Sequence, residues 1–166
     1  DMLTARGYTE IMSNSLTKAA YYETLECYKA ENCVKILNPL SADLNVMRQT
    51  LLFNALEAVA LNVNHRNADL KLFELGNCYF FDPEASGEEN PLARYSEKYC
   101  IGITVTGQDA APSWNVKGAQ ASFYTLRATV EKLLRRFGID IYTLRSESLQ
   151  SDLYSDGIIY TQGPKT

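Results

Sequence analysis

Two apolar segments on either side of a long polar stretch constrain the fold of this chain most strongly. The first covers residues 70–80, and the second, which contains several β-branched residues, covers 99–107. β-branched and aromatic residues favour strands. The polar stretch at 82–98 contains one glycine and two prolines, which favours an exposed loop. Two strands joined by a loop can pair side by side, so we predict an antiparallel sheet at the centre of the fold.

Two segments with apolar residues at helical spacing are predicted to flank this sheet. The first helix is expected at 51–64 with Thr50 as its N-cap, and the second at 123–137 after Ser122. The first helix should bury its apolar stripe, so that Leu56→Asp would unfold the domain. The stripe consists of Leu52, Ala55, Leu56, Val59 and Val63. Strands and helices do not alternate regularly, which predicts an α+β class with an antiparallel sheet flanked by helices.

Weaker patterns predict several shorter elements. The residues before Gly7 look like the last turn of a helix, which the glycine would end in a left-handed conformation. A short helix is expected at 18–28. Further strands are expected at 8–16, 34–37, 139–144 and 157–161.

Length and charge limit what the chain could bind. Its 166 residues suit one domain, 1–166, and its first and last residues suggest a fragment of a longer chain. A net charge of −4 weighs against binding nucleic acid through bulk charge. No stretch approaches the ~20 apolar residues of a membrane span, so the cytoplasm is the default location.

The sequence offers no recognisable set of catalytic, cofactor-binding or metal-binding residues. His65 is the single histidine, and no phosphate-binding glycine loop occurs. The cysteines form no CxxC pair, so a zinc site is not expected, and we predict isolated, buried thiols rather than disulfides. The four cysteines are Cys27, Cys33, Cys78 and Cys100.

Two segments resemble motifs of class II aminoacyl-tRNA synthetases. Residues 6–14 are similar to the first motif, which builds a dimer interface in those enzymes, although Asn14 stands at its proline position. Residues 72–82 look like the approach to the second motif, which ends in aromatic-Arg-x-acid. Phe80 stands at the arginine position and Asp82 at the acidic one, so this motif is degenerate.

A more specific resemblance is to the β subunit of bacterial phenylalanyl-tRNA synthetases. The matching motifs occur in the family's order, from about Leu3 to Leu134. They are Gly7-Tyr8-Thr9-Glu10, Asn38-Pro39-Leu40-Ser41, Met47-Arg48-Gln49-Thr50-Leu51-Leu52, Asn62-Val63-Asn64-His65-Arg66, Phe73-Glu74-Leu75-Gly76, and Trp114 followed by Phe123-Tyr124-Thr125-Leu126-Arg127-Ala128-Thr129-Val130-Glu131.

The resemblance implies a class II-like core without catalysis of its own. In that family the β core packs against a catalytic α subunit in an (αβ)₂ assembly that charges tRNA(Phe). ATP and Mg²⁺ are used by the whole enzyme and not by this domain. Two rival hypotheses are an independent adenylate-forming class II paralogue and a tRNA-binding module, and the acidic charge weighs against the second.

The resemblance also suggests two sets of residues to follow. Subunit contact is expected from the first-motif segment, although its apolar residues could instead be local core. The candidate interface residues are Leu3, Tyr8, Ile11, Met12 and Leu16. Arg48 and Glu74 are expected to form a partly buried structural ion pair.

Overall fold

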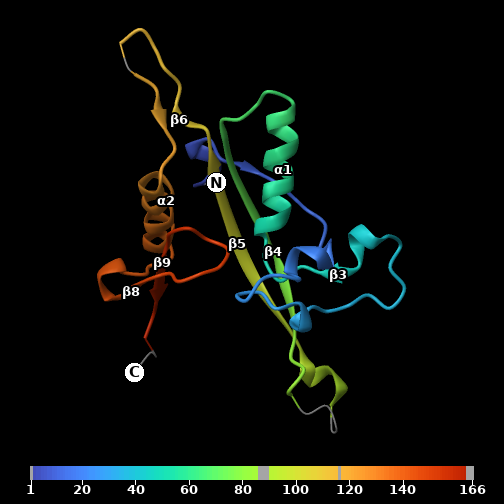
Figure 1. Ribbon diagram of the computed structural model, residues 1–166. Coiled ribbons are helices and arrows are strands. Elements are labelled where there is room, and N and C mark those ends of the chain that lie inside the picture. Colours follow the sequence, from blue (N-terminus) through green and yellow to red (C-terminus); the bar gives the residue numbers. More distant parts are fainter. Residues whose placement is uncertain (1, 86–89, 116, 164–166) are drawn as a thin grey trace.

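A long antiparallel pair of strands lies at the centre of the fold (Figure 1). In this computed structural model, which describes residues 2–85, 90–115 and 117–163, the pair consists of β4 (Leu70–Phe81) and β5 (Tyr95–Thr106). β1 (Thr9–Glu10) adds to the other edge of β4 in parallel, which gives the strand order β1-β4-β5. The predicted pair of central strands is confirmed.

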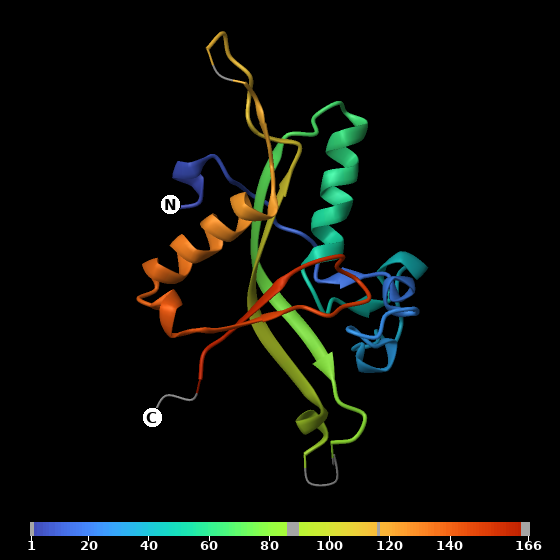
Figure 2. The ribbon, with the colours of Figure 1, turned by 60° about the vertical axis from the view of Figure 1, so that its left-hand side comes forward.

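The two predicted long helices are also confirmed, and they lie on opposite sides of the central strands (Figure 2). α1 (Leu52–Asn64) and α2 (Phe123–Arg136) both contact β5. Ser122 begins α2 in a capping box with Thr125, which satisfies backbone groups that a helix start leaves unpaired. The class is therefore α+β, with a largely antiparallel sheet flanked by helices.

Short elements make up much of the remaining chain. Three two-stranded antiparallel pairs join β2 to β3, β6 to β7 and β8 to β9. The short strands are β2 (Leu16–Thr17), β3 (Val46–Met47), β6 (Gln108–Ala110), β7 (Ala119–Gln120), β8 (Arg145–Ser148) and β9 (Ile158–Thr161). The 3-10 turns are η1 (Thr4–Arg6), η2 (Ala19–Tyr22), η3 (Ala30–Asn32), η4 (Ala42–Leu44), η5 (Pro91–Arg94) and η6 (Ile141–Thr143).

Among the weaker predictions, the turn ended by Gly7 and the strand at 157–161 are confirmed, by η1 and β9. The predicted helix at 18–28 is wrong beyond the single 3-10 turn η2, and 139–144 contains η6 instead of a strand. The strand predicted at 8–16 is reduced to β1 and the first residue of β2, and 34–37 to one β-bridge between Lys35 and Val46.

The segment at 18–28 lies around the fully buried ring of Tyr22, whose hydroxyl accepts the N–H of Gln49 at 3.1 Å. Tyr22 packs with Cys33 and Val46 in a small core of its own. Contacts with this side chain, rather than a repeating backbone pattern, organise the region, which is why periodicity alone misjudged it.

β5 begins earlier than the sequence pattern indicated. Its first residues, Tyr95–Lys98, are exposed and had been assigned to the loop at 82–98. Their register places them opposite Phe81, Phe80, Tyr79 and Cys78, so cross-strand pairing continues beyond the apolar part of the strand. The loop prediction is therefore wrong for 95–98, and its residues 86–89 lie outside the described residues.

The expected burial of the first helix's stripe is only partly correct. Ala55 is buried, but Leu56 is 46% exposed and Val63 is also exposed. At the N-terminal end of α1, Leu51 is buried and its Cβ packs closely over Gly102 of β5. An aspartate at position 56 would remain in contact with water, so the expected unfolding by Leu56→Asp does not follow from this structure.

The prediction that the cysteines are buried thiols is correct for some of the four. Cys33 and Cys78 are buried, Cys100 is half-buried and Cys27 is exposed, and all four are free thiols. No helix in the described part of the chain is both long and apolar enough to cross a bilayer.

Candidate functional site

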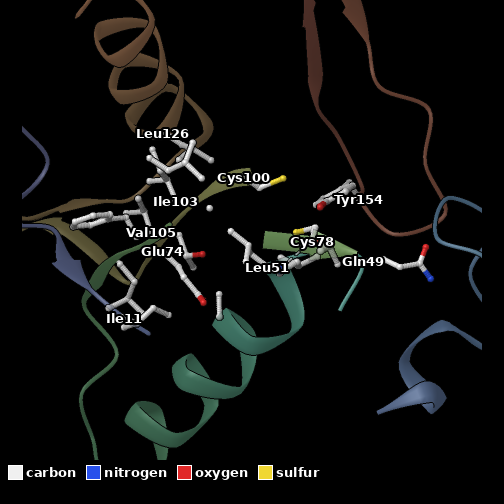
Figure 3. Close-up of a pocket in the computed structure, with 18 of the residues that line it drawn as sticks. Ile11, Gln49, Leu51, Glu74, Cys78, Cys100, Ile103, Val105, Leu126 and Tyr154 are labelled. Atoms are coloured by element: carbon white, nitrogen blue, oxygen red, sulfur yellow. Dashed lines mark hydrogen bonds between the residues drawn. The ribbon is translucent and has the colours of Figure 1, made fainter. Parts of the chain in front are cut away.

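A cleft of about 530 Å³ lies where the start of α1 meets β4 and β5 (Figure 3). Leu51, Glu74 and Cys78 line it from α1's N-cap and β4, and Cys100 and Ile103 line it from β5. The walls are mainly apolar. Such a cleft can accommodate an apolar group, whereas a charged ligand would need matching charge from the side chains around it.

The cleft offers no cation to a phosphate. Of the described residues that line it, none is a lysine or an arginine, and Glu74 is the one acidic residue. The Gln49 amide also lines the cleft, but it already donates to the carbonyl of Lys29 and to Cys33 Sγ. The electrostatics of the cleft therefore disfavour an anionic ligand.

The two residues of the degenerate second motif are not brought together for phosphate binding. Phe80 lines the cleft with its ring half-buried, and the Lys98 ammonium lies over that ring, 5.1 Å from its centroid. Asp82 is exposed just beyond β4, where its Oδ1 accepts the N–H of Glu84. Asp82 thus stabilises a turn, and Phe80 contributes apolar surface.

Arg48 and Glu74 form a buried ion pair beside the cleft. Arg48 Nη1 donates to Glu74 Oε1 at 2.6 Å, and both side chains are at least 96% buried. Arg48 Nε also donates to the carbonyl of Asn77 at 3.0 Å, and the Ser13 N–H donates to the same Glu74 oxygen at 3.1 Å. This network joins the segment before α1 to β4 and to the chain after β1.

Gly76 provides the space for the Arg48 side chain. A Cβ built on Gly76 would overlap with Arg48 Nη2. The Phe73-Glu74-Leu75-Gly76 segment therefore has a physical explanation, because Glu74 supplies the charge and Gly76 leaves the opening through which the guanidinium passes. Sequence reasoning found the pair but missed this role of the glycine.

The five candidate interface residues do not share one surface. Leu3 and Tyr8 are 5% and 4% exposed and pack with Phe73 in the core of the described residues. Met12 is 93% exposed, whereas Ile11 and Leu16 are half-buried. The outward-facing part of the set is therefore centred on Met12.

Tyr8 also ties the beginning of the chain to α2. Its hydroxyl lies 3.0 Å from Thr129 Oγ1, and Thr129 is the buried residue of that helix. A buried hydroxyl needs such a partner, because an unpaired one costs free energy. This long-range contact could not be predicted from the sequence, since Thr129 lies outside the apolar stripe of the helix.

A loop near the end of the chain closes one side of the cleft with Tyr154. Asp152 holds this loop in place by accepting the backbone N–H groups of Glu26 and Cys27 at 2.6 and 3.3 Å. The Glu26 N–H, and after it the Cys27 thiol, hold the pKa of the Asp152 carboxyl below its usual value. Asp152 is thus a structural anchor, and the described residues contain no cluster of three or more metal-ligating side chains.

The family model of the phenylalanyl tRNA synthetase beta chain CLM domain matches residues 1–155 of the chain. Among curated proteins, the phenylalanine–tRNA ligase beta subunit of Bacteroides fragilis is 49% identical over 166 residues, which is 99% of this chain and 20% of the relative. The beta subunit of Porphyromonas gingivalis is 39% identical over 158 residues, 95% of this chain and 19% of the relative. The chain spans about a fifth of the length of these relatives.

Among solved structures, the crystal structure of pyrrolysyl-tRNA synthetase from Desulfitobacterium hafniense is similar, with a TM-score of 0.63 and 16% identity. The match covers 98% of this chain and 52% of that one. At this identity the likeness concerns the fold, and it confirms the predicted class II-like arrangement.

Proposed function

The chain belongs to the phenylalanyl tRNA synthetase β chain CLM domain family, and from this membership we propose that it is the non-catalytic core of a phenylalanine–tRNA ligase β subunit. In this proposal residues 1–166 form one domain of a longer cytoplasmic protein. The domain docks onto a catalytic α subunit within an (αβ)₂ enzyme. That enzyme charges tRNA(Phe) with the help of ATP and Mg²⁺, which this domain does not bind itself.

The observation that carries the proposal is the absence of a cation from the residues lining the cleft, with Phe80 at the arginine position of the second motif. Adenylate formation places negative charge on phosphate oxygens, and enzymes stabilise it with preorganised donors. Loss of one such donor costs roughly 10²–10³ in rate. The Arg48 guanidinium cannot substitute, because it is buried against Glu74. The cleft therefore suits a structural role.

The rival hypothesis, an independent adenylate-forming enzyme, is supported by one feature, the Lys98 ammonium over the Phe80 ring. We expect isothermal titration calorimetry of the β subunit with ATP and Mg²⁺ to show no binding to this domain, because one exposed lysine supplies too little fixed charge. Heat of binding that disappears in Lys98→Met would instead support the rival and overturn the proposal.

The proposed docking surface includes the exposed part of the first-motif segment, with Met12 at its centre and Ile11 and Leu16 beside it. We expect Met12→Asp to weaken capture of the α subunit at least tenfold, because a charge would be placed in an apolar contact. Leu56→Asp is the matched control, since Leu56 is an exposed leucine on α1. Equal capture by both variants and the wild type would remove this segment from the interface.

A further inference from the structure

Two free thiols lie together on the floor of the cleft. Cys78 of β4 pairs with Lys98, and Cys100 of β5 pairs with Gly76, so the cysteines are diagonal neighbours on one face of the strand pair. Gly76, opposite Cys100, has no side chain, although the Arg48 guanidinium lies against it. Both cysteines line the cleft (Figure 3).

We propose that Cys78 and Cys100 form an oxidative modification site, in which a hydroperoxide that enters the cleft converts the two thiols into a disulfide between β4 and β5. The site differs from the rest of the cleft in its chemistry, because it needs no positive charge. It is also separate from the proposed docking function, since neither cysteine belongs to the Met12 segment.

The reaction balances with hydrogen peroxide as the oxidant. Cys100, the more accessible thiol, loses its proton and its sulfur attacks one peroxide oxygen, which breaks the O–O bond and gives a sulfenic acid and water. The Cys78 sulfur then attacks the sulfenic sulfur, and the displaced hydroxide leaves as water with the Cys78 proton. In total, two thiols and one peroxide give one disulfide and two waters.

The environment of each cysteine assigns these roles. Burial raises the pKa of Cys78 to about 12, and the neighbouring Cys100 is the second cause of this rise. Cys78 therefore stays protonated and is a poor first nucleophile. It acts once a sulfenic acid is held beside it. The other buried thiol, Cys33, packs with Tyr22 and accepts a hydrogen bond from the Gln49 amide. Cys27 is exposed.

Peptide mapping tests the proposal on the complete protein. The protein is treated with a small excess of hydrogen peroxide, its remaining thiols are alkylated, and it is digested with trypsin without reduction. Trypsin cleaves after Lys71, Arg94, Lys98 and Lys117, so the cysteines fall in separate peptides, 72–94 and 99–117. We expect these two peptides to be joined by a disulfide, with a mass two hydrogens below the sum of the two peptide masses. Dithiothreitol should separate them.

Two variants complete the experiment. Cys27→Ser should form the same linked peptides, and Cys100→Ser should form none; the half-buried Cys100 is chosen because replacing the buried Cys78 risks the fold. The proposal is overturned if the wild type carries sulfinic acid on peptide 99–117 while peptide 72–94 keeps a free thiol. Linkage of peptide 99–117 to a cysteine other than Cys78 overturns it equally.

Discussion

Arg48→Ala is expected to lower the free energy of unfolding by about 3–5 kcal/mol, because it removes one partner of a buried ion pair. In the variant, Glu74 Oε1 keeps one hydrogen bond, from the Ser13 N–H. Glu74 Oε2 is buried and already accepts no hydrogen bond from the described residues. It also leaves the Asn77 carbonyl without its side-chain donor. An unpaired buried charge is among the most costly defects a protein can contain.

Urea denaturation followed by circular dichroism measures this loss as a shift of the midpoint at unchanged slope. The matched control is Arg127→Ala, which removes the arginine from a surface pair with Glu131 on α2. The Arg127 side chain is 41% exposed, so its loss should barely move the midpoint. Similar losses for the two variants would mean that burial of the Arg48 pair has no energetic consequence.

A double substitution separates the pair from its surroundings. Replacing both partners with apolar residues, as in Arg48→Met with Glu74→Leu, removes the charge that either single variant leaves unpaired. We expect the double variant to be more stable than the summed losses of the single variants Arg48→Met and Glu74→Leu would predict. Strictly additive losses would show that Arg48 and Glu74 do not act as a pair.

The long elements of this fold could be predicted because each repeats its pattern over many residues. The apolar residues follow strand spacing in β4 and β5 and helix spacing in α1 and α2. The structure contains all four elements. The Arg48–Glu74 pair could be suggested from the two motifs that contain it. Its burial and its dependence on Gly76 could not, because they arise when β4 packs against the segment before α1.

The remaining errors share one cause, namely contacts between residues distant in the sequence. Leu56 belongs to a regular stripe, yet α1 packs at its first turn, where Leu51 covers Gly102, and leaves Leu56 exposed. The contact between the Tyr8 hydroxyl and Thr129 joins residues 121 positions apart in the sequence. No local pattern reports such a contact, and the candidate interface stays a prediction.

Gly76→Ala is expected to cost about 3 kcal/mol, although alanine normally suits a strand better than glycine. The cost arises because the new Cβ would occupy the position of Arg48 Nη2, and the guanidinium would have to leave Glu74 or distort β4. Gly163→Ala is the matched control, since nothing lies within 4 Å of its added Cβ, and it should change stability by less than about 0.5 kcal/mol.

The decisive measurement places Gly76→Ala in the Arg48→Ala background. Without the guanidinium the opening is empty, and the nearest remaining neighbour of the new Cβ is Leu51 Cδ2 at 3.4 Å, an ordinary contact. The alanine should then be neutral, or stabilising by about 0.4–1 kcal/mol, because it restricts the unfolded chain. A loss of about 3 kcal/mol that persists in this background would contradict the role of Gly76 as the space through which Arg48 reaches Glu74.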